Sequence, residues 1–244
     1  MALLDVRGLS RRFGGLQAVR DLSFSVGERE IVALIGPNGA GKTTVFSLLS
    51  GFLAPDSGDV HLGGQSIVGR KPHAVCALGL ARTFQIVRPF PKLTVLDNVL
   101  IGALVRHPHR RDAEAQARGV LDEVGLAGKA SQPAGTLTLS ERKRLELSRA
   151  LATEPRLLLL DEVMAGLNST EVERTLDLVR AINARGIAVL LIEHVMRAVM
   201  SLASRIVVLN YGERIAEGRP DEIASDRRVI EAYLGEPDVD AAVP

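Results

Sequence analysis

The stretch IVALIGPNGAGKTT, residues 31–44, decides the fold of this chain. Its first five residues are all apolar, which is typical of a strand that is buried on both faces. The next nine residues, GPNGAGKTT, fit the pattern G-x-x-x-x-G-K-[ST] between a strand and a helix. Glycines in this pattern let the backbone wrap around phosphate groups, so that N–H groups and a helix N-terminus face the anion. The stretch therefore predicts a strand, a phosphate-binding loop and a helix, in that order.

Two side chains of this loop carry specific chemistry. Lys42 would reach the β- and γ-phosphates of a nucleotide, and the hydroxyl of Thr43 would coordinate Mg²⁺. An ordinary glycine-rich turn is the alternative, but average residue frequencies give this pattern by chance in only about 1% of chains of this length. The residues expected to form the phosphate site are Gly36, Pro37, Asn38, Gly39, Ala40, Gly41, Lys42, Thr43 and Thr44.

A pair of carboxylates follows the apolar run LLLL, residues 157–160. Asp161 and Glu162 stand at the end of an expected buried strand, where alternation should point them in different directions. Asp161 can then hold the water shell of Mg²⁺, while Glu162 faces the attacking water as a general base. Such a pair can also be a solvated turn, but the phosphate loop elsewhere in the chain favours the catalytic interpretation.

Further patterns predict an α/β fold. The apolar runs 188–192 and 206–209 indicate more buried strands, and apolar residues recur at helical spacing from 172 to 182. Asn168 with Glu171 makes an N-terminal cap for that helix. Strands that alternate with helices imply a mostly parallel sheet covered on both faces.

Two segments depart from this alternation. Residues 1–30 contain short alternating runs separated by turns, which predicts an N-terminal antiparallel β subdomain. Residues from about 87 to 150 show helical patterns without a convincing strand, which predicts an α-helical subdomain inserted in the core. A single domain over residues 1–235 is expected, and the polar, proline-flanked end EPDVDAAVP, residues 236–244, predicts a flexible tail.

The composition argues against several functions. A formal net charge of +1 disfavours a dedicated nucleic-acid binder, which is usually strongly basic. The single cysteine, Cys76, excludes an intramolecular disulfide and suits a reducing compartment. The uncharged runs are too short to span a bilayer, and the N-terminus shows no signal segment. A cytoplasmic protein with no nucleic-acid partner is therefore expected.

Together, the order of these motifs over residues 3–235 resembles the ATP-binding subunit of an ABC transporter. The resemblance implies a P-loop NTPase core of the ABC ATPase type that binds ATP and Mg²⁺. Phe13 falls where the family has an aromatic that stacks on adenine. Gln85, in ARTFQ, matches a glutamine that touches Mg²⁺ and the attacking water, and His194, in LLIEH, matches a histidine that contacts the γ-phosphate. The resemblance thus implies a catalytic set of Glu162, His194 and Gln85, and a metal set of Thr43, Gln85 and Asp161.

The stretch TLTLSERKRL, residues 136–145, stands where the family has a glycine-rich loop that reaches across a dimer interface to the partner's γ-phosphate. Here the usual Leu-Ser-Gly-Gly-Gln is replaced by Leu-Thr-Leu-Ser-Glu, and glycine's loss matters only if Leu139 or Ser140 needs a positive φ. Thr138 and Glu141 retain a capping box, so a hydroxyl and the positive end of the helix dipole remain available to an anion. We expect Thr138, Ser140 and Glu141 to form a working loop in which Thr138 makes the phosphate contact.

The motifs ARTFQ, AGLN, IEH and VIEAYLGE are similar to those of LivG-type subunits of branched-chain amino-acid importers. That resemblance implies a second ATPase subunit (LivF-like, or a second copy), integral membrane permeases and, indirectly, a substrate-binding protein. It places the chain at the cytoplasmic face of the inner membrane as a peripheral subunit. An apolar groove beside Gln85, formed by Ile86, Val87, Pro89 and Phe90, is expected to receive a permease helix.

Three alternatives stay open from the sequence. An LptB-like ATPase of a lipopolysaccharide exporter shares the style of the C-terminus, but typically has Asp-His where this chain has Glu193-His194. A soluble ABC ATPase of DNA repair or ribosome rescue would carry a coiled-coil insertion or a second cassette. A P-loop kinase would lack the capping-box loop and the histidine after the strand.

Overall fold

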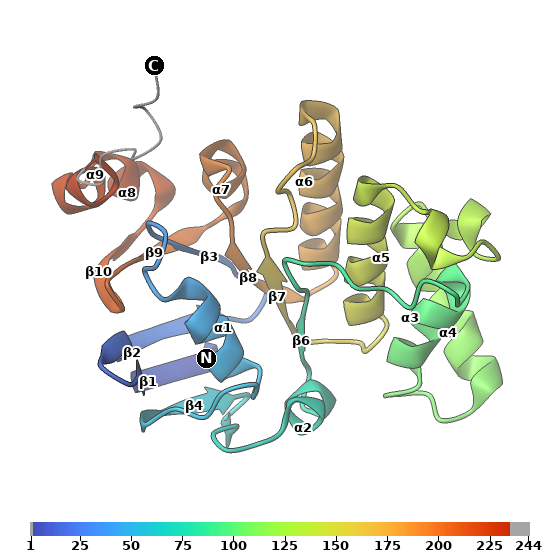
Figure 1. The fold of residues 1–244 in the computed structure, drawn as a ribbon, viewed down its shortest axis with the longest axis horizontal. Helices are drawn as coiled ribbons and strands as arrows, with labels where there is room; N and C mark the ends of the chain where they lie inside the picture. The colour runs from blue at the N-terminus through green and yellow to red at the C-terminus, as the bar shows by residue number, and fades with distance from the viewer. Residues whose placement is uncertain (1, 235–244) are drawn as a thin grey trace.

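The computed structural model describes residues 2–234 and confirms an α/β architecture of two sheets and flanking helices. The helix α1 (Lys42–Leu49) lies between the sheets, and its side chains share one buried cluster with both of them (Figure 1). The other face of the larger sheet shares a second cluster with the remaining large helices. The expected tail, residues 236–244, lies outside the described residues. In the part of the chain that is described, no helix is long and apolar enough to span a bilayer.

The larger sheet has six strands in the order β10-β9-β3-β8-β7-β6. Its strands are β3 (Ile31–Ile35), β6 (Leu80–Arg82), β7 (Leu157–Asp161), β8 (Ala188–Ile192), β9 (Arg205–Asn210) and β10 (Glu213–Gly218). All neighbours pair in parallel except β10, which is antiparallel to β9. The mostly parallel sheet is thus confirmed. The apolar runs 31–35 and 188–192 match β3 and β8 at both ends, while β7 and β9 extend slightly beyond the expected limits.

The smaller sheet is antiparallel, with the order β2-β1-β4-β5. It contains β1 (Ala2–Phe13), β2 (Leu16–Gly27), β4 (Ser57–Leu62) and β5 (Gln65–Ser66). The expectation of short strands at the N-terminus was wrong, because β1 and β2 each run for 12 residues. Several register shifts interrupt their pairing. These irregularities break the alternation of apolar residues, so that only part of each long strand showed a strand pattern.

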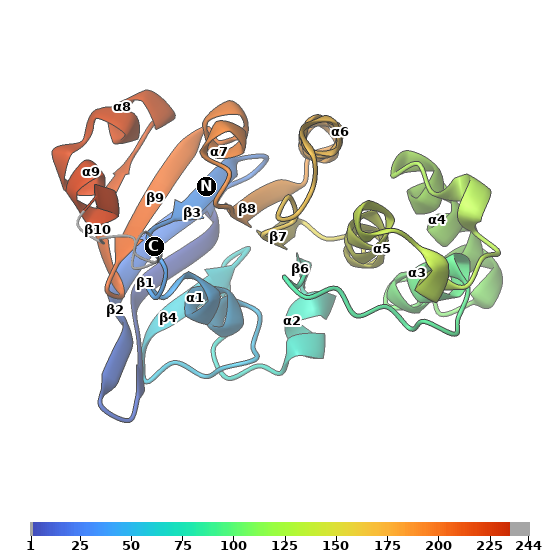
Figure 2. The ribbon, with the colours of Figure 1, turned by 45° about the horizontal axis from the view of Figure 1, so that its top comes forward.

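Nine α-helices are present within residues 2–234. Besides α1 they are α2 (Pro72–Ala77), α3 (Val95–Ala103), α4 (Arg110–Glu123), α5 (Leu139–Leu151), α6 (Ser169–Ala184), α7 (Met196–Leu202), α8 (Pro220–Ser225) and α9 (Arg227–Leu234). Two short 3₁₀ turns, Ala127–Lys129 and Ala134–Thr136, lie between α4 and α5. Figure 2 shows α3 and α4 on one side of the molecule, with α5 between them and the sheet. This grouping is the inserted helical part of the fold.

The parallel strands end at one edge of the larger sheet, and this positions the site. The loop before α1 follows β3, Glu162 follows β7, and His194 follows β8. Gln85 follows β6, which is the outermost strand next to β7. Ligands of open α/β sheets bind at the carboxyl ends of the strands, so these residues stand where chemistry is expected.

Candidate functional site

The loop between β3 and α1 forms a cradle whose outer side is closed by backbone. A Cβ atom on Gly36 would lie 2.1 Å from the carbonyl oxygen of Leu209, and one on Gly41 would lie 2.3 Å from that of Ala18. The amide of Gly212 also donates to the carbonyl of Ala40 across 3.0 Å. Neighbouring strands therefore hold the loop from outside.

The start of α1 offers donors to an anion. Gly41 precedes the helix in a left-handed conformation, and no side chain caps the first turn. No acidic residue lies in that turn. The Lys42 ammonium is buried within the loop, where it donates to the carbonyls of Gly36 and Pro37 at 2.6 and 2.8 Å. A helix N-terminus with uncapped amides beside a lysine fits a phosphate chain.

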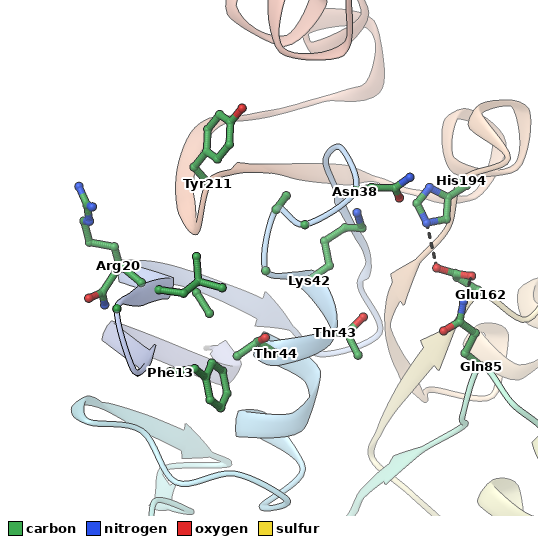
Figure 3. Close-up of a pocket in the computed structure, with 17 residues that line it drawn as sticks. Phe13, Arg20, Asn38, Lys42, Thr43, Thr44, Gln85, Glu162, His194 and Tyr211 are labelled. Atoms are coloured by element: carbon green, nitrogen blue, oxygen red, sulfur yellow. Dashed lines mark hydrogen bonds and ion pairs between the residues drawn. The ribbon is translucent and has the colours of Figure 1, made fainter. Parts of the chain in front are cut away.

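A cavity of about 670 Å³ opens in front of the cradle (Figure 3). The structure brings most of the sequence-derived site residues to this cavity. They are Phe13, Asn38, Gly39, Ala40, Gly41, Lys42, Thr43, Thr44, Gln85, Glu162 and His194. Gly36 and Pro37 instead lie behind it as acceptors for Lys42.

The carboxylate of Glu162 is held at both oxygens. Gln85 Nε2 donates to Oε2 across 2.6 Å, and His194 Nε2 lies 2.9 Å from Oε1. Glu162 comes after the last residue of β7 and has a φ of 49°, and its amide donates to the carbonyl of Ile192. Alternation along a strand was therefore the wrong reason for its direction, because a left-handed turn points it into the cavity.

Asp161 has a different environment, which explains why it stays out of the main cavity. Its Oδ2 accepts from the guanidinium of Arg82 at 2.8 Å, and both side chains are buried. Burial raises the pKa of Asp161, while the charge of Arg82 acts in the opposite direction. Arg82 also donates to the hydroxyls of Ser47 and Ser50, which fixes its head group. Arg82 was not predicted as a site residue, although it is the second residue of the motif ARTFQ.

The residues expected to hold Mg²⁺ share a second cavity of about 460 Å³, which Thr43, Gln85 and Asp161 all line. The described part of the chain contains no group of three or more His, Cys, Asp and Glu residues in metal-binding arrangement. Mg²⁺ commonly uses one or two carboxylates together with substrate phosphates and water, so a hydroxyl, an amide and one carboxylate fit it. In Asp161 the ligand for Mg²⁺ would be Oδ1, because Oδ2 accepts from Arg82.

The end of the cavity distant from Glu162 carries aromatic side chains. Phe13, at the end of β1, is partly exposed, and the Arg11 guanidinium lies 5.0 Å from its ring centroid. Tyr211, in the turn between β9 and β10, also lines the cavity and has a φ of 47°. Tyr211 was not predicted as a site residue, because a tyrosine in a Tyr-Gly turn resembles any surface turn residue. Figure 3 shows Tyr211 and Phe13 on different elements around the cradle.

The glycine-free loop forms the expected cap. Thr138 Oγ1 accepts from the amide of Glu141 at 3.4 Å, and Glu141 Oε2 accepts from the amide of Thr138 at 3.0 Å. Leu139 and Ser140 both have negative φ, so this conformation does not require glycine. Lys129 pairs with Glu141 across 2.5 Å and lowers the pKa of its carboxyl. Thr138, Ser140 and Glu141 do not line the cavity that contains Glu162.

Comparison with known proteins agrees with this geometry. A family model described as ABC transporter matches residues 19–165, and one described as branched-chain amino acid ATP-binding cassette transporter matches residues 213–239. The chain is 42% identical to the high-affinity branched-chain amino acid transport ATP-binding protein BraF of Pseudomonas aeruginosa, over 96% of this chain and 98% of the relative. It is 40% identical to the corresponding protein LivG of Escherichia coli K12 over the same shares.

Solved structures of ATP-binding cassettes also resemble the fold of this chain. A nucleotide-free ATP-binding cassette from an ABC transporter superposes with a TM-score of 0.88 at 30% identity, over 97% of this chain and all of the other. The ADP conformation of an ATP-binding cassette of an ABC transporter matches with the same score, identity and coverage.

Proposed function

The chain belongs to the ABC transporter family of ATP-binding proteins, and on this premise we propose that it powers the import of branched-chain or related amino acids. Membership makes it a nucleotide-binding ATPase subunit of a transporter, which works with membrane permeases. The substrate class is supported by the relatives BraF and LivG, which carry that name over nearly their whole length. The match of residues 213–239 to the branched-chain amino acid model supports it independently. These similarities favour the importer over an LptB-like exporter, a soluble ABC ATPase or a P-loop kinase.

The observation that carries the mechanism is the placement of Glu162 at the mouth of the phosphate cradle. ATP phosphates would lie against the amides at the start of α1, with Lys42 on the β- and γ-phosphates. Thr43, Gln85 and Asp161 would hold Mg²⁺, which when bound offsets the charge on the phosphate oxygens. Phe13 would stack on the adenine ring.

Glu162 then accepts the proton of the attacking water. In the structure its two oxygens are used by Gln85 and His194. Each carboxylate oxygen has two lone pairs, so Glu162 can accept from the attacking water beside these contacts. A γ-phosphate would compete for His194, and this exchange would free a further lone pair of Oε1 for the water. Binding of ATP would in this way favour the contact between the base and the water.

The proposed assembly places the chain at the cytoplasmic face of the inner membrane. Its partners would be a second ATPase subunit, LivF-like or a second copy, with permeases and a substrate-binding protein behind them. Thr138 of this chain would then complete the cradle of the other subunit, because it lies outside the cavity of its own chain.

Uptake of radiolabelled leucine tests the proposal. The chain would be reconstituted in proteoliposomes with the permeases, second ATPase and binding protein of the proposed transporter. We expect uptake that requires ATP on the side of this chain and stops with Glu162→Gln. ATP hydrolysis without uptake of leucine or any other amino acid would reject the importer.

A further inference from the structure

Lys143, on α5, contacts the turn that carries the catalytic carboxylate. Its Nζ donates to the backbone carbonyl of Glu162 across 2.9 Å. α5 belongs to the helical part of the molecule, whereas Glu162 follows β7 of the larger sheet. Figure 2 shows α5 between β7 and the helices α3 and α4. One hydrogen bond therefore joins the helical part to the main chain of Glu162.

The turn needs outside support to keep its shape. Glu162 has a φ of 49°, in a region where residues with side chains are uncommon. Such conformations persist only where surrounding contacts determine them. The carbonyl of Glu162 accepts from Ala165 within the turn at 3.2 Å and from Lys143 outside it. Lys143 therefore supplies a donor from another element.

A buried carboxylate supports the same turn from the sheet side. Glu193 Oε1 accepts from the amide of Met164 at 2.9 Å, and only 2% of Glu193 is exposed. Burial raises the pKa of Glu193 to about 7, and the charge of Lys143 lowers it. The positive charge of Lys143 thus offsets the negative charge of the buried Glu193 carboxylate, while its Nζ donates to the carbonyl of Glu162.

α5 also reaches the far end of the turn. A Cβ atom on Gly166 would lie 3.3 Å from Cδ2 of Leu139, the first residue of α5. Leu139 stands where glycine is usual in the family, so the missing glycine adds a side chain at this contact. The helix that begins beside Thr138 thus touches the turn at two points, one polar and one apolar.

We infer that Lys143 is a positioning residue that ties the orientation of Glu162 to the placement of α5. This inference rests on the proposed roles of Glu162 as base and of Thr138 as the contact to the partner's nucleotide. A shift of α5 at the subunit interface would move the carbonyl of Glu162 and with it the carboxylate. Contact between the Thr138 loop of one subunit and its partner would thereby change the orientation of Glu162 in that same subunit.

The test compares steady-state ATP hydrolysis in the assembled transporter. Lys143→Met keeps most of the side-chain length but removes the donor and the charge. We expect kcat to fall at least roughly tenfold, as is typical for loss of a hydrogen bond from a charged group, with KM changed less than about twofold. Lys143→Arg retains a charged donor and should recover most of kcat. Lys92→Met, at an exposed lysine, is the matched control and should behave as wild type.

The outcomes separate this inference from the proposed function. Wild-type kcat in Lys143→Met, in a transporter that Glu162→Gln inactivates, would overturn the inference alone. Full activity of Glu162→Gln would instead remove the proposed base. If kcat is unchanged and a rise in KM accounts for the whole loss in kcat/KM, Lys143 acts in nucleotide binding. That result would also reject the inference. If Lys143→Met does not fold, as judged by its melting curve, Lys143→Gln is measured with the same expected split.

Discussion

Nε2 of His194 lies 2.9 Å from Oε1 of Glu162, so the segments that follow β8 and β7 meet beside the phosphate cradle. Gln85, after β6, occupies the other oxygen. Three adjacent parallel strands of the larger sheet thus meet at this contact, since Glu162 follows β7 and the two side chains that hold it follow β6 and β8. Displacement of any of these strand ends changes the environment of the base.

Replacement of Glu162 by glutamine should abolish hydrolysis while ATP still binds. Glutamine keeps the shape of the side chain but cannot accept a proton, and loss of a general base typically costs about 10²–10⁴-fold in rate. Hydrolysis is measured by phosphate release and binding by calorimetry. Near-normal turnover would remove Glu162 from the mechanism.

Lys42→Ala should instead weaken nucleotide binding, because it removes the cation that approaches the β- and γ-phosphates. Calorimetric titration with ATP measures this effect. Lys71→Ala, at an exposed lysine outside the cradle, serves as control. Unchanged ATP affinity in Lys42→Ala would contradict the assignment of the cradle.

Thr138→Val and Ser140→Gly should differ in the assembled transporter. The first removes the helix cap and the hydroxyl that we propose contacts the partner's ATP. The cap is worth about 1 kcal/mol, and a hydrogen bond to a charged group is worth about 1.5–3 kcal/mol. We therefore expect ATPase activity to fall at least roughly tenfold. Ser140 lies inside the first turn, so Ser140→Gly should stay within about twofold. The reverse pattern would move the phosphate contact from Thr138 to Ser140.

The stability of the chain should depend on pH through Glu193. Its pKa is raised from 4.5 to about 7 in the fold, so the native state binds this proton more tightly than the unfolded state. The associated stability is complete below about pH 4.5 and is lost as the pH rises through 7. Glu193→Gln cannot ionise, so relative to wild type it should gain up to about 3 kcal/mol between pH 4.5 and 8.5.

Urea denaturation at the two pH values measures this difference. Glu231→Gln, at an exposed carboxylate, controls for a general change of charge. The same pH dependence in wild type and Glu193→Gln would show that Glu193 does not titrate in this range.

The apolar residues expected to form a groove beside Gln85 should contact a permease, although of these four only Ile86 lines the cavity beside Gln85. Ile86 is 66% exposed and Phe90 45%, and exposed apolar groups that gather in one place usually mark an interface. Cysteine cross-linking from Val87→Cys in whole cells should capture a membrane subunit. Capture of no membrane subunit would refute the docking role of this groove.

The strongest sequence signals came from local patterns. The apolar run before the glycine loop gave β3, and the spacing of Thr138 and Glu141 gave the capping box, because both depend on residues that are neighbours in sequence. β6 was missed because three residues are too few to show a period, and its pairing with β7 comes from the tertiary fold.

The residues that hold the site in place were less predictable, because their contacts join parts of the chain that are distant in sequence. Arg82 reaches Asp161 across 79 positions of sequence, and Lys143 reaches Glu162 across 19. No local pattern announces such contacts, since they depend on how the sheet and the helical part pack. The roles of the chemically active residues could be inferred from motifs, whereas the residues that hold them needed the structure.

The close approach of backbone to the cradle also sets the tolerance of this site to mutation. Any side chain at Gly36 or Gly41 would strike a carbonyl of a neighbouring strand, so a saturation library should return only glycine at both positions. Gly39 has no protein atom within 4 Å of its Cβ position, so within the protein only its φ of 77° constrains it. Asparagine, which enters the left-handed region more readily than most residues, is the substitution that should survive there. Three glycines that look equivalent in the motif thus differ in the substitutions that they tolerate.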